Sequence, residues 1–584
     1  MKNTKRIIKG LIWSIKRIVS FKASYFVLLI LEAILNGINP IISLLLTQRI
    51  INDIQLKSES LKIIMILIIA LSIYEILNEL LLNFVQLRLK TNEIKFETFM
   101  QIKILKKISK LDSKEFESSD VYDLINRTQY DANTGILGNL ETFFNVISNL
   151  IGTVSYIVIL MKYNILFLLT IIAVPIVRYY FEKKYSLLEY DTIIENTELE
   201  RRSSYISYVL TNAESFKEIK VFNLFSHFIK QYEEIKGVTN SKLENIYNRK
   251  TLLYSILSMV ETVIDFLITA TIVFQTFIGK LLIGQFILYN NSISSLKQNM
   301  ISIFKQLSTI YKNVAVIIQV KNFFELPLEN VNSNGIIIDK ILNIKLEDVS
   351  YKYKNQQDYT LKNINISFDP SDFVILMGYN GSGKSTLMKI LMCVYHDYEG
   401  MIYVNGIDLK LLNKEAYREK VGVMFQNYIK YETKISENIL YGNLEEKGSS
   451  RIDELLVKVG LNEFKEKKNQ ILGYQFSEGQ QISIGQWQKL ATARALISDA
   501  ELYIFDEPNS SLDLMSEKKV LNSIISETDG KIKILIMHRF SELMLKANKI
   551  IVLDKGRINE IGTHDDLLKN KGIYYKLYSL QDNI

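Results

Sequence analysis

Long apolar runs in the first 320 residues constrain this chain most, because each is long enough to cross a membrane as a helix. A bilayer core about 30 Å thick requires roughly 20 predominantly apolar residues in helical form. We predict six membrane-spanning helices, at residues 23–48, 61–85, 138–160, 164–182, 252–278 and 284–304. This half of the chain should therefore fold in a bilayer, which becomes one of its partners.

The connections between the predicted spans differ greatly in length. Only residues 161–163 separate the third and fourth spans, and Gly279-Lys280 joins the fifth to the sixth. Segments 86–137 and 183–251 are instead long, charged and helical in pattern. We expect short turns on one side of the membrane and long helical extensions on the other. The sixth span is the least apolar because it contains Asn290, Asn291, Lys297, Gln298 and Asn299.

Basic residues orient these spans. The first short loop, at about 51–60, has only Lys57 against Asp53 and Glu59. The amino-terminal tail is far more basic, with Lys2, Lys5, Arg6, Lys9, Lys16, Arg17 and Lys22. Because cytoplasmic segments carry the excess of Lys and Arg, the tail, both extensions and the carboxyl-terminal half should be cytoplasmic. We predict a multi-pass protein of the cytoplasmic membrane.

Charge and metal-binding residue types exclude some classes of function. The net charge of +7 is spread along the chain without a dense basic patch, which argues against nucleic acid as a partner. The single cysteine, Cys393, excludes a disulfide framework and a Cys-rich zinc site. The four histidines show no metal-ligand spacing.

The pattern changes from about Ile336 onward to short strand-like runs, glycine turns and amphipathic helices. Leu342–Leu346 and Ile364–Phe368 alternate apolar and polar residues, as half-buried strands do. We predict a transmembrane domain at 1–325, a linker at 326–340 and a soluble α/β domain at 341–584.

The α/β domain contains the phosphate-binding loop pattern G-x-x-x-x-G-K-[ST], at Gly378–Thr386. The apolar run Phe373–Met377 before it reads as a buried strand, and Leu387–Met392 after it reads as the start of a helix. A strand, a glycine loop and a helix N-terminus aim backbone N–H groups and a positive dipole at one anion. The pattern predicts binding of a nucleoside triphosphate.

A second apolar strand, Leu502–Phe505, ends in the acidic pair Asp506-Glu507. We expect Asp506 to support Mg²⁺ while Ser385 ligates the ion directly. Glu507 would lie next to the γ-phosphate, where its carboxylate can act as general base on the attacking water. The alternative is that the two acids only cap a helix.

Further motifs follow in a fixed order: Tyr353 after a strand, Val423–Gln426, Ile482–Gln486, Ser511–Asp513 and His538. Together with the phosphate loop, they resemble the ATP-binding cassette (ABC) family over essentially the whole chain. The resemblance implies that Tyr353 stacks on adenine, that Gln426 reaches Mg²⁺ and that His538 contacts the γ-phosphate in a catalytic role. The implied ATP contacts are Tyr353, Gly378, Asn380, Gly381, Ser382, Gly383, Lys384, Ser385, Thr386 and Gln426, and the implied Mg²⁺ ligands are Ser385, Gln426 and Asp506.

The resemblance also implies a membrane all-α six-helix domain of the type I ABC exporter fold, followed by an α/β P-loop nucleotide-binding domain. Such a chain is a half-transporter that pairs with a second one, by expectation an identical chain. The residues that complete the partner's ATP site would be Ser483, Gly485, Gln486 and Asp513. Ile484 stands where the family signature usually has glycine, which leaves open whether hydrolysis is slower.

The expected substrate is a modified peptide, because Phe425–Tyr431 and Gly485–Lys489 are similar to bacterial exporters of lanthipeptides. A multidrug or lipid exporter of the same architecture is the alternative. A soluble ABC ATPase acting on nucleic acid or ribosomes is a remote one, which the membrane-length runs disfavour.

Acidic residues inside the predicted spans suggest a substrate path. Two pairs are spaced four apart on one helix face, Glu75 with Glu79 and Glu261 with Asp265, and Glu32 and Glu141 are two more acids at membrane depth. Carboxylates in lipid are costly and usually face water-filled paths. We hypothesise an acidic cavity for a cationic substrate. The alternatives are a polar outer mouth or pairing with Lys297.

Overall fold

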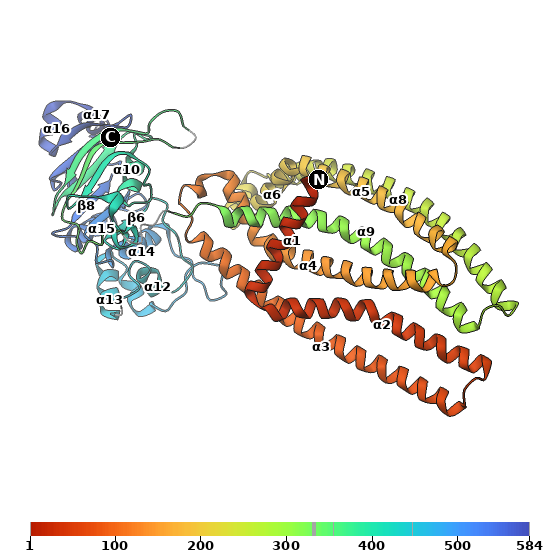
Figure 1. Cartoon of the computed structure of the whole chain (residues 1–584). Helices are drawn as coiled ribbons and strands as arrows, with labels where there is room; N and C mark the ends of the chain where they lie inside the picture. Colours follow the sequence, from red (N-terminus) through yellow and green to blue (C-terminus); the bar gives the residue numbers. More distant parts are fainter. Residues whose placement is uncertain (1, 330–334, 354–355, 447, 583–584) are drawn as a thin grey trace. The chain divides into compact units, whose positions relative to one another are not determined.

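The computed structural model describes residues 2–329, 335–353, 356–446 and 448–582, drawn in Figure 1. The chain divides into two compact units, Met1–Leu111 with Glu115–Leu328, and Asp112–Lys114 with Glu329–Ile584. The first unit is helical and the second contains both β-sheets.

The helical unit is built from long helices joined by short turns. Their bounds are α1 Lys2–Phe21, α2 Ala23–Leu56, α3 Leu61–Ile108, α4 Ser119–Met161, α5 Ile165–Glu195, α6 Thr197–Thr211, α7 Ala213–Val221, α8 Phe225–Phe277 and α9 Ile283–Glu325, with a short 3₁₀ turn η1 at Glu115–Glu117. Helix α3 has 48 residues, about 72 Å at 1.5 Å per residue, so it extends well beyond a bilayer core.

Among the described residues, five helices are long and apolar enough to cross a membrane: α2, α3, the Gly135–Met161 part of α4, α5 and α8. They contain five of the six predicted spans. The sixth predicted span lies in α9, which is 43 residues long but is not among these five, in keeping with the asparagines in its first half.

Helix α4 makes close contacts with other membrane-spanning helices. Helix α4 packs along α9 and α2, and α5 packs with α8 and α9. A Cβ at Gly37 of α2 would lie 2.9 Å from the Ser148 carbonyl oxygen of α4, so the two backbones meet where glycine permits it. The absence of a side chain at this position lets van der Waals contact replace the hydrophobic effect that lipid does not supply.

The second unit contains two sheets. The four-stranded sheet has the order β2-β1-β4-β5, and the six-stranded sheet has the order β10-β9-β3-β8-β7-β6. The strands are β1 Ile344–Tyr351, β2 Leu361–Phe368, β3 Phe373–Gly378, β4 Glu399–Val404, β5 Ile407–Asp408, β6 Val421–Met424, β7 Leu502–Asp506, β8 Ile532–Ile536, β9 Lys549–Asp554 and β10 Arg557–Gly562. The helices of this unit include α10 Lys384–Leu391, α14 Ile484–Leu496 and α15 Leu514–Glu527.

Strand β3 lies at the centre of the six-stranded sheet, parallel to β8 on one side and to β9 on the other. All six of its residues are buried. Phe373, Ile375 and Met377 enter one apolar core, whereas Val374 and Leu376 enter the other. Helices cover both faces of such a sheet, so its polar chemistry is confined to the carboxyl ends of the strands.

Candidate functional site: a nucleotide pocket

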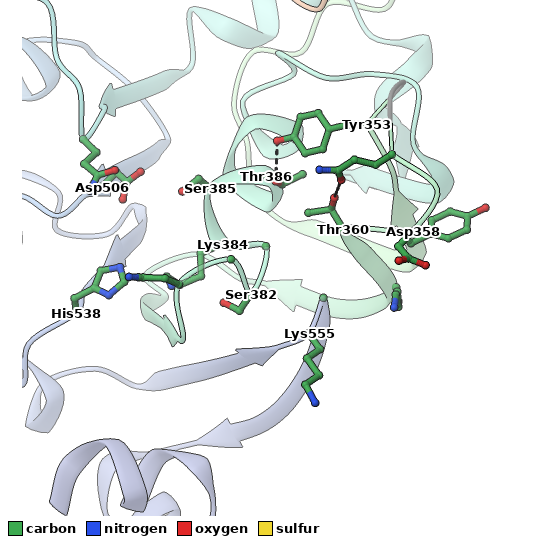
Figure 2. Close-up of a pocket in the computed structure, with 18 of the residues that line it drawn as sticks. Tyr353, Asp358, Thr360, Ser382, Lys384, Ser385, Thr386, Asp506, His538 and Lys555 are labelled. Carbon is green, nitrogen blue, oxygen red and sulfur yellow. Dashed lines mark hydrogen bonds between the residues drawn. The ribbon is translucent and has the colours of Figure 1, made fainter. Parts of the chain in front are cut away.

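Three neighbouring parallel strands bring distant sequence motifs to one edge of the sheet. The order β3-β8-β7 places the end of β8, followed by His538, between the ends of β3 and β7. Strand β3 leads into the glycine loop, and β7 ends at Asp506. A pocket of about 890 Å³ lies at this edge, with residues from all three strand ends in its lining (Figure 2).

The glycine loop depends on backbone conformations that other residues rarely adopt. Gly378 has φ 142° and Gly383 has φ 104°. A Cβ at Gly378 would lie 2.1 Å from the Leu553 carbonyl oxygen of β9, so the loop approaches this strand too closely for any side chain. Helix α10 begins at Lys384 without a side-chain cap, which leaves its first N–H groups available to an anion.

Two buried polar side chains of the loop point to a phosphate ligand. Lys384 is 6% exposed, and its ammonium group donates to the carbonyl oxygens of Gly378 (2.8 Å) and Tyr379 (3.0 Å). Burial lowers the pKa of Lys384, an effect that the nearby Asp506 and Glu507 carboxylates oppose. The Ser382 hydroxyl is buried and has no hydrogen-bond partner among the described residues. An anionic oxygen in the loop would satisfy that hydroxyl and the helix N-terminus together.

The carboxylates at the end of β7 have different environments. Burial, together with the neighbouring Glu507 charge, raises the pKa of Asp506 to about 6, against the opposing charge of Lys384. Glu507 lies just beyond the strand in a left-handed conformation with φ 51°. Strained backbone of this kind costs about 1–3 kcal/mol and persists only where surrounding contacts hold it.

Gln426 and His538 converge on Glu507 in the structure. The Gln426 amide donates to Glu507 Oε1 at 2.9 Å, and His538 Nε2 lies 3.2 Å from the same oxygen. Burial and the Lys384 charge lower the pKa of His538, whereas the Glu507 carboxylate opposes this shift. A carboxylate held by two neighbours in an open pocket has the position needed to accept a proton from water.

Gln488 is a functional neighbour that the sequence reasoning missed. Its side chain is fully buried, although it comes from α14. The amide donates to the Glu507 carbonyl oxygen (3.0 Å) and the Ser510 hydroxyl (3.2 Å), and its oxygen accepts from the Ser511 N–H (2.9 Å). A glutamine among the buried apolar residues of α14 was the available signal.

Tyr353 also lies in the pocket lining, as the adenine assignment requires. Its hydroxyl is 3.0 Å from the Thr386 hydroxyl (Figure 2), and its ring is half-buried in an edge-on contact with Tyr395. The lining also contains residues of the β1–β2 connection, of the start of β2 and of the turn after β9, which the sequence did not single out: Gln356, Asp358, Tyr359, Thr360, Lys362, Lys555 and Gly556.

The signature residues do not line this pocket. Ser483 caps α14: its hydroxyl accepts from the Gln486 N–H, and the Gln486 side chain accepts from the Ser483 N–H. A Cβ at Gly485 would lie 3.1 Å from the Ser511 carbonyl oxygen, so the turn before α15 packs against this glycine. Asp513 caps α15 by accepting from the N–H groups of Met515 and Ser516.

Ile484 stands at the start of α14 with a side chain that is 60% exposed. Its backbone carbonyl accepts a hydrogen bond from Tyr428, which follows Gln426 in the chain. The substitution of the usual glycine therefore adds an exposed apolar group without distorting the helix start.

The structure does not bring the four acids of the predicted substrate cavity together. Glu75 and Glu79 are exposed on α3, where the Ser43 hydroxyl donates to Glu75 at 2.6 Å. On α8, the buried Glu261 lies 3.5 Å from Arg178, and Asp265 pairs with Lys297, as one alternative held. Contact of these acids with a substrate stays a prediction.

Comparisons with known proteins agree with this geometry. Residues 361–510 match the ABC transporter family. The chain is 32% identical to the subtilin transport ATP-binding protein SpaT of Bacillus subtilis, over 98% of this chain and 94% of that protein. It is 30% identical to the nisin transport ATP-binding protein NisT of Lactococcus lactis subsp. lactis, over 97% and 95%. Its fold matches a bacterial Atm1-family ABC exporter structure with ATP bound, with a TM-score of 0.75, 17% identity and coverage of 97% and 98%.

The two relatives match this chain over nearly its whole length. The match therefore includes both the apolar helices and the domain with the nucleotide pocket. The chain belongs to the ABC transporter family, as a multi-pass membrane exporter whose cytoplasmic domain binds and hydrolyses ATP to drive transport.

Proposed function

We propose that two copies of this chain pair to export a peptide, and that each ATP is held between the phosphate loop of one chain and the signature of the other. The observation that carries the pairing is the position of Ser483 and Gly485 outside the pocket that contains Lys384. The Ser483 hydroxyl uses an acceptor site to cap α14, so its hydrogen is available to a phosphate oxygen on the partner.

In the proposed ATP complex, the glycine loop and the N-terminus of α10 hold the phosphates, Lys384 neutralises their charge and Tyr353 stacks on the base. Ser385, Gln426 and Asp506 are suited to Mg²⁺, since hydroxyl, amide and carboxylate oxygens are the donors it prefers. The Gln426 nitrogen donates to Glu507, which leaves its oxygen for the ion. A bound Mg²⁺ would neutralise charge that develops on the phosphate oxygens.

Glu507 is proposed as the general base. Gln426 and His538 hold its Oε1 in place, which leaves Oε2 to accept the proton of the attacking water. The left-handed backbone at Glu507, fixed through Gln488, directs the side chain into the pocket rather than along β7. Hydrolysis then releases the paired domains and allows the membrane helices to change between inward-open and outward-open states.

Relatives that transport subtilin and nisin, at 32% and 30% identity over nearly the whole chain, support a peptide substrate. The test is ATPase activity of the purified protein in proteoliposomes, with a modified peptide or with a lipid added. We expect the peptide to raise the rate of ATP hydrolysis, and we expect the Glu507→Gln variant to have no ATPase activity. Stimulation by lipid alone would overturn the peptide assignment, and activity from a strictly monomeric protein would overturn the pairing.

A further inference from the structure

A second cavity lies in the helical unit, between α2, α3 and α4. Its volume is about 280 Å³, and its polar lining consists of Tyr25, Glu32, Gln86, Lys90, Glu93, Glu141 and Asn145. Pockets for whole ligands usually have volumes of about 300–1,000 Å³. The size therefore suits one side chain or one charged end of a larger molecule.

The charges in this cavity are unbalanced. Lys90 pairs with Glu93 at 2.7 Å, and the two residues lie three positions apart on α3. Among the described residues, neither Glu32 nor Glu141 has a basic partner within ion-pair distance, and Glu32 is hydrogen-bonded only by the neutral Gln86 side chain. Three carboxylates thus share one small space with a single ammonium group, that of Lys90, which already pairs with Glu93. Such an arrangement inside a membrane domain is costly unless water or a positive ligand enters.

Tyr25 supplies an independent indication of a ligand. Its side chain is only 1% exposed, and its ring packs in the apolar core of α1–α4. Its hydroxyl borders the cavity and has no hydrogen-bond partner among the residues that the structure describes. Buried hydroxyls are normally paired, because an unpaired one costs about 1–3 kcal/mol. A donor entering the cavity would satisfy the hydroxyl and both carboxylates.

The position of the cavity matches the route of a cytosolic substrate. Glu32 is the tenth residue of α2, about 14 Å from its cytoplasmic end at 1.5 Å per residue. Glu141 follows the start of the apolar part of α4 at Gly135, and Glu93 lies beyond the apolar part of α3. All three carboxylates therefore lie toward the cytoplasmic ends of their spans.

We propose that this cavity, which we call the α2–α4 acidic cavity, binds an ammonium or guanidinium group of the exported substrate, so that the substrate class is a cationic peptide. An ammonium carries three donors and a guanidinium five, which suits the acceptors of Glu32, Glu141 and Tyr25. Within the described residues, no His, Cys, Asp and Glu group of three or more is arranged for a metal ion, so the fit is to an organic cation. The inference rests on the proposed export of a peptide.

The test uses the full-length protein in proteoliposomes and two synthetic peptides, one with two lysines and one with norleucine in their place. ATPase stimulation is titrated for the wild type, for Glu32→Gln/Glu141→Gln and for Tyr25→Phe. The control is Glu97→Gln, which removes one carboxylate charge one turn beyond Glu93 on α3, outside the cavity. Basal ATPase activity and size-exclusion elution verify that each variant is folded.

We expect the double variant to raise the half-maximal concentration of the lysine peptide about tenfold, and Tyr25→Phe to raise it about threefold. The norleucine peptide should have a higher half-maximal concentration than the lysine peptide with the wild type. This concentration should be the same for the wild type and for all variants. Equal shifts for both peptides, or equal shifts in the double variant and in Glu97→Gln, would overturn the cavity assignment while leaving peptide export intact. If only Tyr25→Phe folds, an unchanged lysine-peptide titration overturns it. A wild type that responds to neither peptide refutes the proposed function itself.

Discussion

Replacing Gln488 by methionine tests whether a buried amide holds the catalytic carboxylate in place. The variant keeps the volume of the side chain but removes three hydrogen bonds, to the Glu507 carbonyl oxygen, the Ser510 hydroxyl and the Ser511 N–H. At about 1 kcal/mol each, the loss is about 3 kcal/mol. This is similar to the 1–3 kcal/mol that a left-handed conformation such as that of Glu507 costs.

Without this support the loop should relax, and Glu507 should leave the position from which it accepts a proton. If the whole loss appears in the barrier to hydrolysis, the rate falls by roughly a hundredfold, since 1.36 kcal/mol corresponds to tenfold. We expect kcat to fall between about ten- and a hundredfold, with KM for ATP changed by less than about twofold. None of these three hydrogen bonds involves the phosphate loop or Tyr353, so ATP binding should persist.

The assay is steady-state ATPase activity of the reconstituted protein over a range of ATP concentrations. Thr492→Val is the matched control: Thr492 is equally buried on α14, one turn later, but its hydroxyl bonds Gln488 O and Met424 Sδ instead of the loop. Gln488→Glu, which keeps an acceptor for Ser511 and loses the donors, should fall in between. A Gln488→Met enzyme with kcat within twofold of the wild type would refute the positioning role.

Further predictions concern the same pocket. Glu507→Gln should lower kcat by about a hundredfold or more, while fluorescent ATP analogues still bind, because only the proton acceptor is lost. Tyr353→Ala should raise KM for ATP about tenfold through loss of stacking, whereas Tyr353→Phe keeps the ring and should stay within about twofold. Asp506 has a pKa raised from 3.8 to about 6, so the folded state binds the extra proton and stability of the nucleotide-free protein should fall as pH rises from 4 to 6. Asp506→Asn should remove that fall, and Tm measured by thermal unfolding at pH 4 and pH 7 checks it; a parallel fall in wild type and variant contradicts it.

The sequence by itself determined the division into a membrane part and an α/β part, because apolar length and strand-like alternation are local properties. It also predicted the motif residues of the nucleotide pocket, although, apart from Tyr353, not those between β1 and β2, at the start of β2 or after β9. The structure brings Lys384, Gln426, Asp506 and His538 together, since consecutive motifs at the ends of parallel strands must meet at one sheet edge.

Only the tertiary structure decided which polar residues contact each other across different helices and strands. No sequence motif gave Gln488 a role, and its three contacts depend on how α14 packs against β6 and α15. In the membrane part, spacing grouped Glu261 with Asp265, but packing pairs them with Arg178 and Lys297 and leaves Glu32 and Glu141 facing a cavity instead. Spacing along one helix fixes a face, whereas the neighbour opposite that face is set by contacts between helices far apart in the chain.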